Sequence, residues 1–246
     1  MHENRVILEI SGEDRESFLQ GLVTNNVAGL STLSYAALLT PQGKYIADFF
    51  LCPMGESILL DVDASLAPAL QQKLNMYKLR AKISINPSTK YAIRGIDARP
   101  DDGFPDPRHP DLGWRAYRDE PGDAPQIDWD AIRVAHCIPE SGIELTPDSF
   151  ILEAGFEQLH GVDFRKGCYV GQEVTARMKH KTELRKGLVR VDITGEAAPG
   201  TPITTEDGKE AGTLYTSSGN QALAYLRFDR ASGPMTAGSA KITWPG

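Results

Sequence analysis

The residues with the clearest capacity for chemistry lie in one short stretch, KGCYVGQE, at residues 166–173. Cys168 stands two residues after Lys166 and just before GQEVTARMKH, a pattern that predicts a helix beginning near Gly171. A helix N-terminus and a nearby cation both favour a thiolate and so lower the pKa of a cysteine. Gly167 and Gly171 indicate a tight backbone path, because glycine tolerates positive φ. The stretch therefore predicts a functional thiol, although free cysteines are also commonly small buried residues.

The other two cysteines are predicted to lie in the core. Cys52 ends an apolar strand-like run, and Cys137 ends an apolar helical pattern. Three widely spaced cysteines indicate a reducing compartment and no disulfide framework. Without a CxxC pair or a Cys/His cluster, the sequence predicts no zinc or iron–sulfur centre of its own. His160 or His180 could serve Cys168 as a base, so a thiol enzyme stays open as a hypothesis.

Charge is unevenly distributed along the 246 residues, whose net charge is −7. In residues 165–190, eight basic residues stand against two acids, which leaves +6 around the cysteine motif. This stretch is either a solvated face or a local site for an anionic ligand. In residues 97–130, ten acids stand against four arginines, with six of the 16 prolines. The acidic total predicts no direct binding of nucleic acid.

The elements that must position the motif are short and of both kinds. Apolar alternation predicts strands and a hairpin, and apolar residues at helical spacing predict two helices. The predicted strands are 5–10, 57–63, 80–85 and 91–96, the hairpin is 34–52 with its turn at 41–44, and the helices are about 14–21 and 66–79 with Ser65 as the cap. These elements indicate a small α+β layer.

The middle and the end of the chain differ from this layer. The acidic, proline-rich stretch at about 97–128 predicts a long loop or linker. DWDAIRVAHC, at residues 128–137, predicts a short amphipathic helix, and residues 146–159 are ambiguous. From about residue 184, short strands separated by Gly, Pro, Asp and Asn predict a small all-β domain. No apolar run approaches the roughly 18 residues that span a bilayer, and no secretory signal is visible.

KGCYVGQE followed by ARMKHK resembles the signature of the folate-binding YgfZ family. Its members are relatives of the glycine-cleavage T-protein that support maturation of iron–sulfur proteins. FLQGLVTNNV, LLTPQGKYIADFFL and MYKLRAKISI resemble other segments of that family, so the resemblance covers nearly the whole chain. It implies an α+β fold of three domains in a T-protein-like ring around a central opening. The third domain would be a small C-terminal β-barrel.

Together with the predicted elements, the resemblance implies where these domains lie. Residues 1–50 and about 128–183 would form a discontinuous N-terminal α+β domain. Residues of about 51–127 would form a ferredoxin-like α+β domain that carries the acidic loop. The barrel would occupy about 184–246.

The resemblance implies that tetrahydrofolate or a derivative binds in the central opening. A folate has a flat pterin and an anionic glutamate tail, so its site should offer aromatic walls and nearby Lys or Arg. Tyr77 could equally be packed on a helix face, Arg80 in a surface ion pair and Asp48 in a structural hydrogen bond. The residues implied at this site are Lys166, Tyr169, Gln172, Glu173, Arg177, Tyr77, Arg80, Asp48 and Asn26.

Two residues depart from the pattern of the T-protein. That protein has paired aspartates, the first of which assists aminomethyl chemistry, whereas this chain has Ala47 and Asp48. Alanine accepts no proton, so a folate-dependent one-carbon transferase of the aminomethyl type is the less favoured alternative. Asn26 replaces an aspartate that relatives often show, and it keeps an amide without the charge. Cys168 has no counterpart in the T-protein, which favours a function carried by this thiol.

The resemblance thus implies a folate-binding accessory protein for assembly or repair of iron–sulfur proteins. Cys168 would act as a nucleophile, a transient metal ligand or a redox group. The partners that the resemblance implies are a reduced folate and iron–sulfur client or assembly proteins, with radical enzymes that modify tRNA among the candidate clients and with no membrane. The expected location is the cytoplasm, or the mitochondrial matrix if the chain is eukaryotic.

Overall fold

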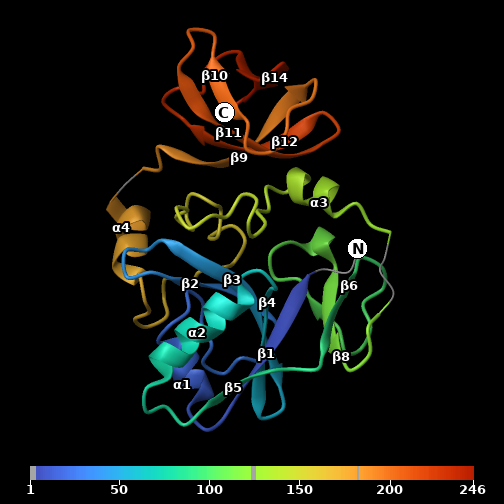
Figure 1. Cartoon of the computed structure of the whole chain (residues 1–246), viewed down its shortest axis with the longest axis vertical. Coiled ribbons are helices and arrows are strands. Elements are labelled where there is room, and N and C mark those ends of the chain that lie inside the picture. The colour runs from blue at the N-terminus through green and yellow to red at the C-terminus, as the bar shows by residue number, and fades with distance from the viewer. Residues whose placement is uncertain (1–3, 123–125, 182) are drawn as a thin grey trace. The chain divides into compact units, whose positions relative to one another are not determined.

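The computed structural model describes residues 4–122, 126–181 and 183–246, which form two compact, discontinuous units (Figure 1). Among the described residues, no helix has both the length and the apolar character needed to cross a membrane. The predicted boundary at residue 50 lies inside strand β3 (Tyr45–Met54), so a single sheet contains residues from both sides of it. The first unit is Met1–Gln126 with Glu157–Val174, and the second is Ile127–Phe156 with Thr175–Gly246.

The first unit is built on a five-stranded antiparallel sheet of order β2-β3-β4-β1-β5. Side chains alternate along β3, so Ala47, Phe49 and Leu51 enter the apolar core whereas Asp48 and Phe50 face the opposite side. The predicted hairpin and the strands predicted at 5–10 and 57–63 are confirmed, whereas the strand predicted at 80–85 begins only at Ser84 and continues to Pro87. The strands are β1 (Arg5–Ser11), β2 (Ser34–Leu39), β3 (Tyr45–Met54), β4 (Ser57–Asp63) and β5 (Ser84–Pro87).

Two helices cover the apolar face of this sheet (Figure 1). α1 (Arg15–Gln20) and α2 (Ala67–Lys78) both bury leucine side chains in the core, and both helices are confirmed. The prediction that Ser65 caps α2 is wrong. The Ser65 hydroxyl donates to Asp63 Oδ1 at 2.5 Å, and Leu66 occupies the N-cap position.

The acidic, proline-rich stretch is not the loop predicted at 97–128. Within it, β7 (Phe104–Pro105) and β8 (Trp114–Arg118) join β6 (Tyr91–Gly95) in a three-stranded sheet of order β6-β8-β7. The part of the prediction at 123–125 lies outside the described residues.

Paired charges explain why this stretch packs. Asp106 accepts hydrogen bonds from Arg108 Nη2 at 2.8 Å and from Arg115 Nε at 3.2 Å. Arg115 Nη1 also lies 3.4 Å from Asp61 of β4, to which Arg5 of β1 donates at 2.7 Å. Burial by itself would raise the pKa of Asp106, but Arg108 and Arg115 outweigh it and hold that pKa below its ordinary value. Buried charges are tolerated when they are paired. These pairs hold β7 and β8 against the five-stranded sheet.

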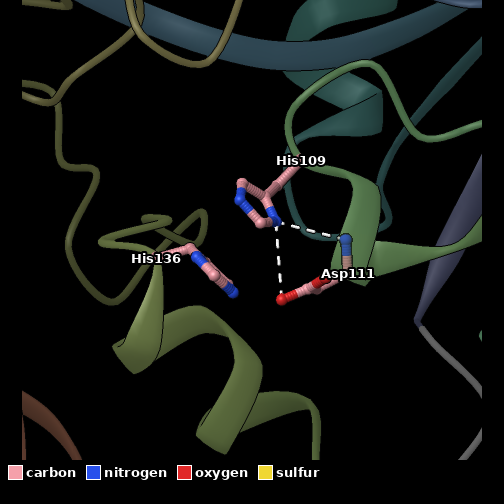
Figure 2. A group of neighbouring side chains, drawn as sticks. All are labelled: His109, Asp111 and His136. Atoms are coloured by element: carbon pink, nitrogen blue, oxygen red, sulfur yellow. Dashed lines mark hydrogen bonds and ion pairs between the residues drawn. The ribbon is translucent and has the colours of Figure 1, made fainter.

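A short turn of 3-10 helix, η1 (Pro110–Leu112), connects β7 to β8. His109 begins it, and its Nδ1 accepts a hydrogen bond from the backbone N–H of Asp111 at 3.2 Å (Figure 2). The Asp111 carboxylate lies 3.9 Å from the same nitrogen. His109 therefore satisfies a backbone donor that the start of a helical turn would otherwise leave open.

The second unit contains a closed, antiparallel six-stranded barrel of order β10-β11-β12-β9-β14-β13. Closure leaves no sheet edge unpaired, and the interior is filled by small and branched apolar side chains. The predicted all-β end of the chain is confirmed. The strands are β9 (Lys186–Thr194), β10 (Pro202–Thr205), β11 (Glu210–Ser218), β12 (Gln221–Arg227), β13 (Met235–Ala237) and β14 (Ala240–Thr243).

A helix lies beside β11 in the same unit. α3 (Trp129–Ala135) confirms the predicted amphipathic helix, and the ambiguous segment at 146–159 is made of turns. Arg133 of α3 donates to Glu144 at 3.0 Å and to Thr216 of β11 at 2.9 Å. This buried network ties α3 and the turn that contains Glu144 to the barrel.

Candidate functional site

The predicted motif forms a short loop in which an exposed cysteine stands between two buried side chains. Lys166 is 8% exposed and Tyr169 is 7% exposed. Cys168 and Gly167 between them are exposed. We call residues 166–169 the thiol arch, because its two ends are buried and its middle is open to solvent.

Lys166 is tied to the protein's own backbone. Its Nζ donates to the carbonyl oxygen of Val23 at 2.5 Å and to that of Asn25 at 2.8 Å. The same nitrogen lies 5.3 Å from the centre of the Tyr169 ring. Burial lowers the pKa of Lys166 to about 8, although nearby Asp163 opposes this shift. The lysine thus holds the arch from within and does not point its charge at solvent.

The segment that accepts the hydrogen bonds of Lys166, residues 23–25, is itself held by several hydrogen bonds, which no local sequence pattern predicted. Asn25 Nδ2 donates to the carbonyl oxygen of Tyr35 on β2 at 2.8 Å and to that of His160 at 2.6 Å. Thr24 Oγ1 donates to the carbonyl oxygen of Gly161 at 2.7 Å. Thr24 and Asn25 therefore join β2 to the chain that leads into the arch. Their only sequence signal was their place beside Asn26 in the FLQGLVTNNV segment.

The glycine after the arch meets the turn of the β2–β3 hairpin. Gly171 has φ 83°, and a Cβ there would lie 2.7 Å from the carbonyl oxygen of Thr40 and 3.2 Å from Gly43 Cα. The predicted tight path is therefore real at Gly171. It is absent at Gly167, around which a Cβ would meet nothing within 4 Å. α4 (Gln172–Lys181) follows as predicted, beginning in the first unit and continuing in the second.

The other two cysteines are less accessible than Cys168, with Cys52 buried and Cys137, which was predicted to lie in the core, half-buried. Cys52 is fully buried on β3, as predicted, and burial raises its pKa to about 12. Cys137 lies just after α3 and not inside a helix, with its Sγ 3.5 Å from the carbonyl oxygen of Leu188. Burial also raises the pKa of Cys137 to about 12. Cys168 is thus the one exposed thiol of the chain.

Asp48 of β3 takes part in a buried hydrogen-bonded group with two tyrosines of the β2–β3 hairpin. It is 5% exposed and accepts hydrogen bonds from the hydroxyls of Tyr35 at 2.9 Å and Tyr45 at 2.6 Å. Burial and the neighbouring Asp48 raise the pKa of Tyr35, so this phenol stays a donor. These contacts favour the structural interpretation of Asp48. Ala47 is fully buried on the opposite face, in the apolar core.

The remaining predicted folate contacts are spread over separate elements. Asn26 is exposed, and its amide accepts from Gln20 at 2.9 Å. Tyr77 is half-buried against the core of the first unit, and Arg80 is exposed two residues beyond the end of α2. The structure therefore brings Lys166, Tyr169 and the segment leading to Asn26 together, but not Tyr77, Arg80 or Asp48. The other three candidates lie on α4, where Gln172 is half-buried, Glu173 is exposed, and Arg177 is exposed in the second unit.

Neither histidine forms a ready catalytic pair with Cys168. Within the described part of the chain, no hydrogen bond joins His160 to Cys168, and His180 belongs to the second unit. His160 instead lines an open hollow of about 470 Å³ in the first unit. The other lining residues are Asn25, Glu157 and residues 162–165. Among the described residues of the first unit, the arrangement offers an exposed thiol on a fixed support, and His160 is not hydrogen-bonded to it.

The fold places the chain among aminomethyltransferase-like proteins. The structure is similar to that of glycine cleavage system aminomethyltransferase T from Bartonella henselae, with a TM-score of 0.74 over 98% of this chain and 82% of that chain, at 13% identity. Residues 185–245 match the family model of the CAF17 C-terminal beta-barrel domain. Together these findings confirm the predicted fold class, including the barrel at the end of the chain.

Sequence comparison then identifies the family. The chain is 31% identical over 280 residues to the mitochondrial iron–sulfur cluster assembly factor IBA57 of Mus musculus, covering 95% of this chain and 78% of that protein. It is 28% identical to the protein of the same name from Homo sapiens, with the same coverage. The chain belongs to the IBA57 family of iron–sulfur cluster assembly factors. The expected family, YgfZ, is therefore corrected to IBA57, while the aminomethyltransferase-like fold and the link to iron–sulfur assembly hold.

Proposed function

We propose that this chain is an iron–sulfur cluster assembly factor that acts through the thiol of Cys168 and binds a reduced folate. Membership of the IBA57 family supports the first part. The observation that carries the second is the thiol arch, which exposes Cys168 while Lys166 and Tyr169 are buried on either side of it. A loop fixed at both ends suits a side chain that must meet a partner in one defined position.

A thiolate at this position can bind iron during transfer of a cluster. Soft thiolate ligands favour iron–sulfur clusters, and most such clusters are held by four cysteines. This chain has one exposed thiol, because Cys52 and Cys137 are shielded. A cluster in transit at Cys168 would therefore need further ligands from a second protein, either a client or another assembly factor. Attack by the thiolate on a disulfide of such a partner is the alternative use of the same group: a mixed disulfide forms, the partner's S–S bond breaks, and its other sulfur leaves as a thiolate.

The chemistry of the available residues fits a folate only with a smaller contact set than the sequence implied. Lys166 and Asp48 are used inside the fold, and the ring of Tyr169 is largely covered. Tyr77 and Arg80 keep exposed surface, which suits the pterin and the glutamate tail respectively. Asn26, Gln172 and Glu173, which belong to the same unit, can add polar contacts. A bound reduced folate supplies a carrier for one-carbon units, which the protein need not use for transfer.

Aminomethyl transfer is not part of this proposal. Position 47 is an alanine that is fully buried in the apolar core. Asp48 beside it is engaged by the hydroxyls of Tyr35 and Tyr45. Neither residue can orient an amine or take its proton in this arrangement. Clients could include radical enzymes that modify tRNA, and the place of action would be the mitochondrial matrix in a eukaryote and the cytoplasm in a bacterium.

The proposal is tested in cells that lack this chain and receive it from a plasmid. Cys168→Ala should leave the activity of iron–sulfur enzymes at the level of cells without the chain. Gly167→Ala is the matched control, because a Cβ there meets nothing within 4 Å. It should restore activity as the unaltered chain does. Equal rescue by both variants would remove Cys168 from the mechanism.

A further inference from the structure

We propose that Lys166 is a positioning residue, whose ammonium group holds the thiol arch on the backbone carbonyls of Val23 and Asn25 and so fixes Cys168 in place. The inference rests on the proposed function, in which Cys168 is the working thiol. It replaces the expectation that Lys166 contacts a ligand. The two bonds, at 2.5 Å and 2.8 Å, use two of the three N–H donors of the ammonium group inside the protein.

The surface that receives the ammonium group is rigid. Asn25 spans the carbonyl oxygens of Tyr35 and His160, and Thr24 Oγ1 binds that of Gly161. The backbone N–H of Ala37 in turn donates to Thr24 Oγ1 at 2.8 Å. The carbonyl oxygens that accept from Lys166 are thus held on the five-stranded sheet. A side chain that donates to them is therefore held there as well.

The other end of the arch is anchored independently. Tyr169 is buried, and the backbone N–H of Gln172 donates to the Tyr169 carbonyl at 3.2 Å as α4 begins. Gly171 is wedged against the hairpin turn. Only Gly167 and Cys168 lie between the two anchors, so the bonds of Lys166 decide how freely the thiol moves. Without them, Cys168 would stand on a longer loop, whose nearest link to the 23–25 segment is the hydrogen bond from the Asp163 N–H to the Thr24 carbonyl oxygen at 3.1 Å.

A lysine is an expensive choice for this position if packing were its only purpose. Removing an ammonium group from water carries a large penalty, and the lowered pKa of Lys166 reflects that penalty. A methionine would fill a similar volume without it. What a methionine cannot do is donate hydrogen bonds to two carbonyls at once. The ammonium group is therefore suited to holding the arch on the backbone of the 23–25 segment.

The test is the mobility of a nitroxide spin label attached to Cys168, the exposed thiol. Lys166→Met should shorten the rotational correlation time of the label by about twofold or more, because loop motion adds to side-chain motion. Arg165→Gln is the matched control. It removes one positive charge from the neighbouring residue, whose side chain is 97% exposed and lies 3.8 Å from the carboxylate of Asp163. Its label should move as in the unaltered chain.

Two further measurements keep the test decisive. If Lys166→Met does not fold, Lys166→Leu takes its place, since it also removes every donor of the ammonium group and label mobility must still rise. Unchanged mobility in a folded variant of either kind overturns the inference. In the cell assay, Lys166→Met should fail while its Cys168 can still be alkylated. If Cys168→Ala is inactive but Lys166→Met rescues fully, positioning fails and the proposed function stands. Full rescue by Cys168→Ala defeats the proposed function itself.

Discussion

Gly171 and Gly43 pack backbone to backbone, so the loop that carries the thiol and the turn of the β2–β3 hairpin touch without side chains between them. A Cβ at residue 171 would lie 3.2 Å from Gly43 Cα and 2.7 Å from the carbonyl oxygen of Thr40. Both glycines have positive φ, 83° and 76°, which other residues adopt at a cost. This contact holds the end of the loop that follows the arch close to the hairpin turn.

Substitution of Gly171 by alanine should therefore destabilise the first unit. Backbone strain and the clash with Thr40 predict a loss of about 1–3 kcal/mol in the free energy of unfolding. Gly167→Ala should change it by less than about 0.5 kcal/mol, because that site is open. Urea unfolding of the two variants measures the difference. Equal stabilities would show that residue 171 is free to move away from the hairpin.

Lys166 should make stability depend on pH in alkaline solution. An unfolded lysine titrates near pH 10.4, whereas burial lowers the pKa of Lys166 to about 8. Between these values the unfolded chain binds the proton that the folded chain has released, so stability rises with pH across this window. Urea midpoints measured from pH 7 to pH 10 should show this gain in the unaltered chain relative to Lys166→Met. Parallel pH profiles for the two proteins would contradict the lowered pKa.

The buried charge network should make Asp106 far more important than its neighbours in the acidic stretch. Asp106→Asn removes a carboxylate that pairs with Arg108 and Arg115, and should lower stability by about 3–5 kcal/mol. Asp102→Asn is the control, since Asp102 pairs with Arg118 in solvent and exposed pairs contribute little to stability. Chemical unfolding compares the two variants. The account of the three-stranded sheet fails if Asp106→Asn is as stable as Asp102→Asn.

Alkylation should distinguish the three cysteines. In the folded protein near neutral pH, iodoacetamide should modify Cys168 and spare Cys52 and Cys137, whose burial raises their pKa to about 12. All three should react in urea. Mass spectrometry of the digested protein locates the adducts. Labelling of Cys137 at a rate similar to Cys168 would show that the shield around Cys137 opens readily.

Folate binding should be independent of the thiol. Anaerobic calorimetry should give the same affinity for tetrahydrofolate in the unaltered chain and in Cys168→Ala. Arg80→Gln should weaken binding, because its guanidinium group is expected to pair with the glutamate tail. Lys78→Gln, which removes the same charge two residues away, provides the comparison. Absence of binding in the unaltered chain would remove the folate from the proposal and leave the thiol function intact.

Local patterns predicted much of the first sheet and the barrel. Apolar alternation located β1, the β2–β3 hairpin and β4, and helical spacing located α1 and α2. The acidic stretch was missed because its packing depends on partners far away in the chain. Arg115 reaches Asp61, and Asp61 in turn binds Arg5. The local sequence shows the prolines, acids and arginines of the stretch but not the distant residues that pair with them.

The candidate site was predicted in part for the same reason. The motif and its exposed cysteine could be found from residue types and spacing. The role of Lys166 could not, because its hydrogen-bond acceptor at Val23 lies 143 residues earlier in the chain. Asp48 was similarly ambiguous until Tyr35 and Tyr45 were found to enclose its carboxylate. Distant backbone acceptors and buried phenols leave no local pattern in the sequence.

The most direct test of the central claim is the cluster content of an iron–sulfur enzyme purified from cells that carry only Cys168→Ala. Mössbauer spectroscopy of this enzyme, purified from cells grown on iron-57, would measure that content. The account predicts an enzyme that is present but lacks its cluster, beside full occupancy with Gly167→Ala. Full occupancy in the Cys168→Ala cells would show that assembly does not pass through this thiol.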